Sequence, residues 1–109
     1  MRIVVCSLAS ILLTGFTLSA QARHLSESER YMCSWGSGVA GKAQSSKLSG
    51  VSRYAVRKQL QAQRFPKQWM RRMALGIAEQ TYDSESRMKP ERVKRVYYDD
   101  CIQHELARR

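Results

Sequence analysis

Carboxylates are scarce in this sequence. It contains 9 Asp and Glu residues against 19 Lys and Arg residues, and no carboxylate lies between Glu29 and Glu79. The basic residues of that interval include Lys42, Lys47, Arg53, Arg57, Lys58, Arg64, Lys67, Arg71 and Arg72. Such a block of one charge sign attracts anionic partners, although a solvated surface that keeps a small protein soluble has the same composition.

Histidine is also rare, which limits the catalytic and metal chemistry that the chain can support. Only His24 and His104 occur, and His104 follows Asp100 at the i, i+4 spacing of one helix face. A Ser–His–Asp triad needs a serine placed against such a pair, and a zinc site needs three or four ligands. We therefore expect no enzyme activity, no metal and no cofactor, with a small hydrolase that uses His104 as the less favoured alternative.

Alternation of apolar and polar residues, the pattern of a half-buried strand, is missing throughout. Residues 36–41 read Gly-Ser-Gly-Val-Ala-Gly, which is a G-x-G-x-x-G sequence. A dinucleotide site needs a strand before this motif, whereas here a helical pattern precedes it. We interpret these glycines as small residues at a close helix crossing or at a kink.

The first 22 residues have the composition of an export signal. Met1-Arg2 is positive, residues 3–18 are mostly apolar, and Ala20-Gln21-Ala22 has small residues at both positions that a signal peptidase reads. The apolar run is short for a transmembrane span. We expect cleavage after Ala22, a periplasmic or secreted location, and one helical domain over residues 23–109.

Export also decides how the three cysteines are interpreted. Cleavage removes Cys6 and leaves Cys33 and Cys101, which have one intramolecular pairing. A disulfide is the default state of such a pair in an exported chain. It would close a loop of about 70 residues, which the chain-entropy estimate values at roughly 4 kcal/mol.

Four segments carry helical patterns. Ser26 and Glu29 have the spacing of a capping box and open a helix that runs to about Lys47. A basic helix follows over roughly residues 52–63. Small residues recur on one face of the first helix at Cys33, Gly36, Ala40 and Ala43.

Two prolines mark the other helix starts. Pro66 is expected in the first turn of a third helix that fades near residues 82–83, and Pro90 opens a fourth that reaches about residue 106. The third helix has the clearest apolar face, formed by Trp69, Met70, Met73, Ala74, Ile77 and Ala78. The inner face of the fourth helix is expected at Val93, Val96, Tyr97 and Cys101.

Together these segments predict a compact all-α domain of four helices. In an up-down-up-down arrangement, the start of the first helix and the end of the fourth lie at the same end. Cys33 is early in the first helix and Cys101 is late in the fourth. The expected disulfide and the expected topology therefore agree.

Binding is the function that this composition favours. We expect a non-catalytic protein whose basic face contacts an acidic protein or an anionic envelope polymer. An alternative is peripheral contact with anionic lipid or lipopolysaccharide through the third helix, whose apolar face is also needed for the core. Nucleic acid is disfavoured by the exported compartment and by the expected burial of Trp69. The basic face comprises Arg53, Arg57, Lys58, Arg64, Lys67, Arg71 and Arg72.

The positions of a few residues resemble those of small exported bacterial proteins that are helical and have no assigned activity. These residues are Cys33, Ala40, Ala43, Gln44, Gly50, Tyr82 and Cys101. The chain also resembles periplasmic immunity or inhibitor proteins, which are small, helical and disulfide-linked. The resemblance covers most of residues 26–106. It implies an exported, helical protein and transfers no site residue.

Overall fold

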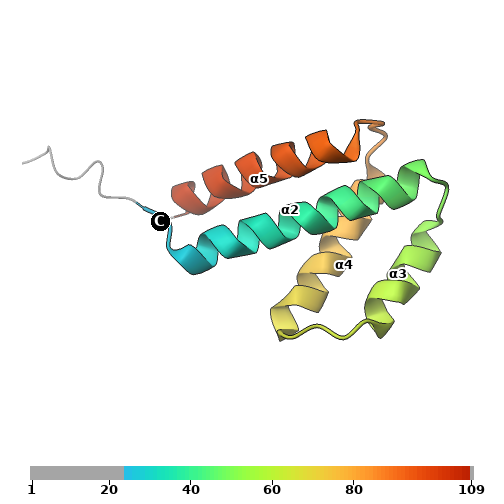
Figure 1. The fold of residues 1–109 in the computed structure, drawn as a ribbon, viewed down its shortest axis with the longest axis horizontal. Coiled ribbons are helices and arrows are strands. Elements are labelled where there is room, and N and C mark those ends of the chain that lie inside the picture. Colours follow the sequence, from blue (N-terminus) through green and yellow to red (C-terminus); the bar gives the residue numbers. More distant parts are fainter. Residues whose placement is uncertain (1–23, 109) are drawn as a thin grey trace, which may run out of the picture.

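Four helices make up the part of the chain that the computed structural model describes, residues 24–108. They are α2 (Glu27–Leu48), α3 (Arg53–Ala62), α4 (Gln68–Asp83) and α5 (Pro90–Ala107), and no strand occurs among these residues (Figure 1). The all-α, four-helix prediction is confirmed. The expected signal peptide at residues 1–22 lies outside the described residues.

Side-chain caps fix the starts of the first two helices. Ser26 and Glu29 form the predicted capping box: Ser26 Oγ accepts a hydrogen bond from Glu29 N at 3.1 Å, and Glu29 Oε1 accepts one from Ser26 N at 2.9 Å. Ser52 Oγ accepts from Ala55 N at 3.0 Å at the start of α3. Between these two helices the chain turns at Gly50, whose φ of 90° suits glycine.

The start of α4 differs from the prediction. The helix begins at Gln68 with Lys67 as its N-cap, so Pro66 precedes the helix and is not in its first turn. Phe65 packs edge-on against Trp35 of α2, with ring centroids 6.1 Å apart, and Lys67 is extended at φ −126° and ψ 144°. The helix thus starts two residues later than the local pattern indicates, after a loop in which Phe65 packs on α2. Pro90 opens α5 as predicted.

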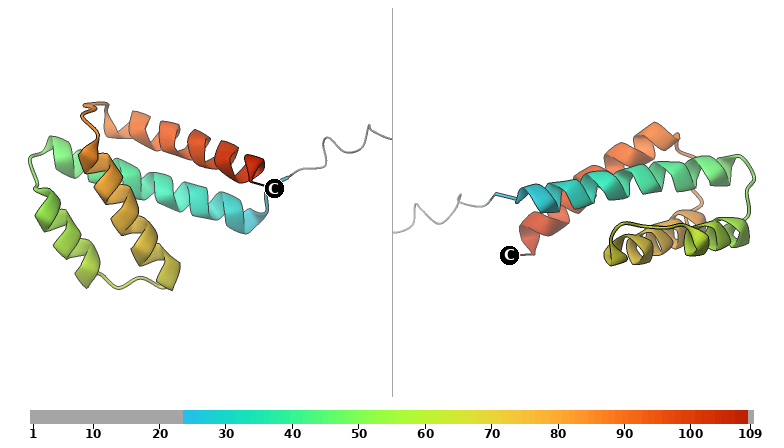
Figure 2. Two further views of the ribbon diagram at one scale, coloured as in Figure 1. Left: turned by 180° about the vertical axis from the view of Figure 1, so that it is seen from behind. Right: turned by 60° about the horizontal axis from the view of Figure 1, so that its bottom comes forward.

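Helix α2 is the centre of the molecule. Helix α5 packs along it in the opposite direction, and α4 packs on it with α3 alongside (Figures 1 and 2). The α3–α4 hairpin is inclined to the α2–α5 pair, so the arrangement is not a set of four parallel rods. With 10 residues, α3 is about 15 Å long and too short to follow α2, whose 22 residues span about 33 Å.

Small residues let the helices approach α2 closely. A Cβ atom added at Gly36 would lie 2.7 Å from Met73 Cε of α4 and 2.9 Å from Tyr97 Cε1 of α5. One added at Gly41 would lie 2.6 Å from Lys94 Cγ. The G-x-G-x-x-G run is therefore in the middle of a helix, and its interpretation as a close crossing is confirmed.

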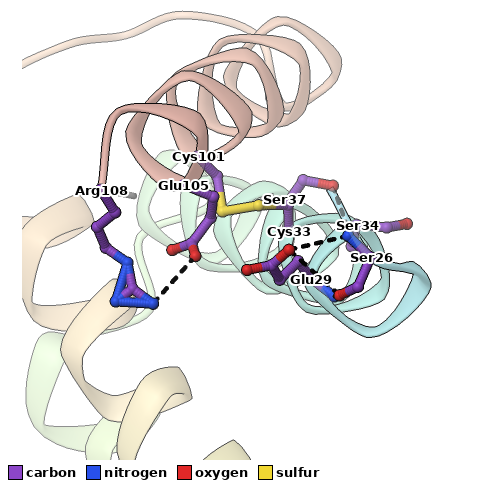
Figure 3. The surroundings of a disulfide bond; sticks show 8 residues. All are labelled: Ser26, Glu29, Cys33, Ser34, Ser37, Cys101, Glu105 and Arg108. Carbon is purple, nitrogen blue, oxygen red and sulfur yellow. Dashed lines mark hydrogen bonds and ion pairs between the residues drawn. A yellow bond between two sulfur atoms is a disulfide. The ribbon is translucent and has the colours of Figure 1, made fainter. Parts of the chain in front are cut away.

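A disulfide joins α2 to α5. Cys33 and Cys101 are bonded with their Cα atoms 5.6 Å apart, at the end where α2 begins and α5 ends (Figure 3). Cys33 has no exposed surface, and nearby Glu105 is also buried and pairs with Arg108 at 3.4 Å. The predicted pairing and the predicted placement of both cysteines are confirmed.

The apolar faces of α4 and α5 follow the prediction to different extents. On α4 the predicted face includes the buried residues Met70, Ala74, Ile77 and Ala78. On α5, Val96 remains 42% exposed although it was expected to face inward, because α5 packs closely against α2 alone. None of the helices between residues 24 and 108 is long and apolar enough to cross a membrane.

Candidate binding site

Two of the seven residues of the predicted basic face are paired with carboxylates of α4. Arg53 donates to Glu79 Oε1 at 3.0 Å and to Asp83 Oδ1 at 2.6 Å, and Arg57 donates to Glu79 Oε2 at 2.7 Å. The hydrogen bond from Arg57 holds the pKa of Glu79 below its ordinary value. These two arginines therefore join α3 to α4, and their charge is largely compensated within the molecule.

Four of the other five surround the loop between α3 and α4. We call this group the basic tip: Arg64, Lys67, Arg71 and Arg72, all of which are exposed. Arg71 is partly anchored, because it donates to the carbonyl of Gln63 at 2.7 Å and its guanidinium lies 5.6 Å from the centre of the Phe65 ring. Lys58, the fifth, is exposed in the middle of α3 with its ammonium 5.6 Å from the centre of the Tyr54 ring.

Positive charge at the basic tip is reinforced by the start of α4. The first turn of this helix contains no acidic residue, and the Lys67 side chain makes no capping hydrogen bond. A helix N-terminus carries a partial positive charge, which nearby carboxylates usually compensate. Among residues 24–108 the ion pairs involve Arg53, Arg57 and Arg108, so none reaches the basic tip. The tip thus combines four exposed cations with a helix N-terminus whose partial charge is not compensated by a carboxylate in its first turn.

A groove runs between α2 and the α3–α4 hairpin and leads to the basic tip. Its volume is about 860 Å³, within the range of ligand-binding clefts. Buried Ala43, Val56, Ala74 and Ala78 line it, together with partly buried Val39 and Leu60. Of the residues that the structure describes, Lys42 is the one charged residue in its lining.

Aromatic rings close one end of the groove. Trp35 and Phe65 line it, and Trp35 also packs edge-on against Trp69 with centroids 5.4 Å apart. Arg71 lies against the Phe65 ring, so a cation from the basic tip adjoins this aromatic end. Trp35 therefore belongs both to the packing between α2 and α4 and to the wall of the groove.

The candidate catalytic and metal residues are placed differently. Asp100 and His104 are both exposed on α5, and the α3–α4 loop that carries the basic tip lies away from that helix (Figure 1). Within residues 24–108 no three His, Cys, Asp or Glu side chains are grouped so as to hold a metal ion.

Sequence reasoning missed the groove and the ion pairs. The groove depends on the tilt of a short hairpin, for which the residue pattern contains no signal. For the ion pairs the sequence does contain a signal. Arg53 and Arg57 are four residues apart on one helix, and Glu79 and Asp83 are four residues apart on the next. Two such pairs on neighbouring antiparallel helices can meet, since residues four apart share a helix face.

Comparison with known proteins gives no assignment: no protein-family model matches the chain, and neither a curated protein nor a solved structure matches it.

Proposed function

We propose that the protein is an exported, non-catalytic binding protein whose basic tip contacts an acidic partner. The observation that carries the proposal is the set of four exposed cations at the uncapped start of α4, none of them in an ion pair within the described residues. Charge of one sign gathered at one site steers an oppositely charged partner and sets its orientation. The proposal narrows the basic face expected from sequence to residues 64–72.

Export is supported by the disulfide and by the composition of residues 1–22. Disulfides persist in oxidising compartments and are rare where cellular thiols keep cysteines reduced. The Cys33–Cys101 bond fits an exported chain, and the leader-like segment supplies the route. An acidic protein or an anionic polymer of the cell envelope would meet the basic tip there.

Retention on immobilised polyglutamate tests the role of the basic tip. The mature chain is expected to be retained and to elute with increasing NaCl, because salt screens exposed charges. Substitution of Arg64, Lys67 and Arg72 together by Gln should shift elution to a clearly lower NaCl concentration. A matched control replaces Arg87, Arg92 and Arg95 by Gln, since these three exposed arginines lie in the α4–α5 loop and on α5.

The control variant distinguishes binding at the basic tip from a general attraction by net charge. Both triple variants lose three positive charges, so a non-specific attraction predicts equal shifts. The proposal predicts a large shift for the tip variant and a small one for the control. Equal shifts, or no retention of the unaltered chain, would contradict it.

A further inference from the structure

The groove between α2 and the α3–α4 hairpin has dimensions that limit what can occupy it. Along α2 its lining extends from Ser34 to Ser46, and the rise between these two residues is about 18 Å of helix. Its length therefore corresponds to about three helical turns of an occupant. Its other wall is formed by α3 from Val56 to Ala62 and by Gln63, which follows the helix.

The bottom of the groove, which we call its floor, is apolar, and its solvent-exposed edges, which we call its banks, are polar. Ala43, Val56 and Ala74 belong to the floor and are buried, whereas Lys42 and Gln59 belong to the banks and are exposed. An occupant would thus meet apolar atoms on one side and water on the other. An amphipathic helix has this division of surface, with an apolar stripe on one side and polar residues on the other.

The charged residues around the groove indicate which charge an occupant should carry. Among the described residues no carboxylate lines the groove, Lys42 lies on its α2 wall, and Arg71 borders its aromatic end beside Phe65. Arg64, another cation of the basic tip, is next to Phe65 in the chain. A helix that carries Asp or Glu on its polar side would therefore be attracted both along the groove and at its end.

Other anionic occupants fit these features less well. An envelope polysaccharide would satisfy the basic tip but has no continuous apolar face for the groove floor. A single lipid chain would satisfy the floor but would lie with one side in water, since the banks are exposed along the groove. We infer that the groove binds an acidic amphipathic helix of a partner protein. The apolar stripe of that helix would lie on the floor of the groove, and its carboxylates would face Lys42 and the basic tip.

This inference rests on the proposed function, because it names the class of partner that the basic tip recruits. Its test uses a labelled peptide of about 14 residues, roughly 20 Å as a helix, with Leu at i, i+3, i+4 and i+7 and Glu elsewhere. Fluorescence anisotropy measures its Kd for the mature chain. A second readout is the tryptophan emission of the protein, which comes from Trp35 in the groove lining and from Trp69 packed against it, and which should shift when the peptide, itself free of Trp, binds.

Two glycines offer matched variants. Gly38 lines the groove, and an added Cβ there meets no atom within 4 Å. Gly76 is exposed on α4 outside the groove lining, and an added Cβ there also meets no atom within 4 Å. Gly38→Leu should fill the groove and Gly76→Leu should leave it open, while both favour the helix because glycine is a poor helix former.

The inference predicts that Gly38→Leu weakens peptide binding about tenfold or more, since it occupies the space of a central anchor, and that Gly76→Leu changes it by less than about twofold. A peptide of the same composition with its leucines spread around the helix should bind much more weakly. Equal affinity for the two peptides would overturn the inference, as would unchanged affinity in Gly38→Leu, and neither result would affect the polyglutamate test of the basic tip.

Anionic vesicles test whether lipid occupies the groove instead of a helix. Vesicles of phosphatidylglycerol should not displace the peptide from the groove. Displacement by vesicles that is lost in Gly38→Leu but kept in Gly76→Leu would assign the groove to lipid and overturn the inference. Failure of both the peptide and polyglutamate to bind would overturn the proposed function as well.

Discussion

At the residue scale, a single buried amide organises one end of the molecule. Gln44 of α2 is 1% exposed, and its Nε2 donates to the carbonyl of Ser86 at 3.1 Å and to that of Met88 at 2.8 Å. Lys47, one turn later, donates to the carbonyls of Thr81 and Ser84 at 3.0 and 2.8 Å. Two side chains of α2 thus donate hydrogen bonds to backbone carbonyls at the end of α4 and in the loop that leads to α5.

We predict that Gln44→Leu lowers the free energy of unfolding by about 1–3 kcal/mol, because two partly buried carbonyls lose their donor. Urea unfolding followed by circular dichroism measures the change. Gln61→Leu is the control, since Gln61 is exposed on α3, and it should change stability by less than about 0.5 kcal/mol. A similar effect of both substitutions would show that the Gln44 hydrogen bonds do not stabilise the loop.

Acid should weaken the contact between α3 and α4. The hydrogen bond from Arg57 lowers the pKa of Glu79 below its ordinary value of 4.5, so the carboxylate contributes stability above that pH and loses it as the pH falls through the lowered pKa. We predict that Glu79→Gln flattens this acid-side decline and leaves the protein less stable at neutral pH. Urea unfolding at a series of pH values would detect it, and an unchanged pH profile would contradict the assigned pairing.

At the element scale, α2 holds the fold together through contacts on several of its faces. Its glycines admit Met73, Tyr97 and Lys94 at distances that a larger side chain would prevent. The disulfide then fastens α5 to it at one end. The α3–α4 hairpin is joined internally by its ion pairs and is held on α2 by the buried cluster of Ala43, Val56 and Ala78. The aromatic contacts of Trp35 with Phe65 and Trp69 add to this packing.

Loss of the disulfide should cost more than any single surface contact. Replacement of Cys33 and Cys101 together by Ser is predicted to lower the free energy of unfolding by about 2–5 kcal/mol, since the unfolded chain regains the freedom of a long loop. Urea unfolding of the double variant and of the reduced unaltered protein should agree. In the mature protein, mass spectrometry should find both cysteines oxidised, and two free thiols would contradict the pairing.

Much of this element structure could be predicted because its causes are local. The capping box at Ser26, the helix start at Pro90 and the pairing of Cys33 with Cys101 each follow from residue type and spacing. The start of α4 at Gln68 could not be predicted in the same way, since the loop before it packs on Trp35 through Phe65, a contact between distant residues that the local pattern does not contain. The groove likewise depends on the length and tilt of α3 and α4, which single-residue patterns do not encode.

At the scale of the whole molecule, positive charge is distributed unevenly once the ion pairs are counted. The acid-free interval of the sequence suggested one continuous basic face, but carboxylates from beyond it, Glu79 and Asp83, fold back onto Arg53 and Arg57. The four cations of the basic tip remain without an ion pair around the α3–α4 loop, which lies away from α5 (Figure 1). Further exposed cations occur elsewhere, at Lys42 and Lys58 within the interval and on the arginines of α5. A long basic stretch of sequence thus becomes a small basic tip beside an apolar groove.

The most direct test of this account is to map where an anionic probe contacts the protein. We predict that polyglutamate, titrated into the isotope-labelled mature chain, shifts the backbone amide NMR signals of residues 63–72 and leaves those of α5 largely unchanged. The shifts should reverse with NaCl, since the contact is electrostatic. Shifts spread evenly over the basic residues of α5 and the tip, or no shifts at low salt, would contradict the assignment of binding to the basic tip.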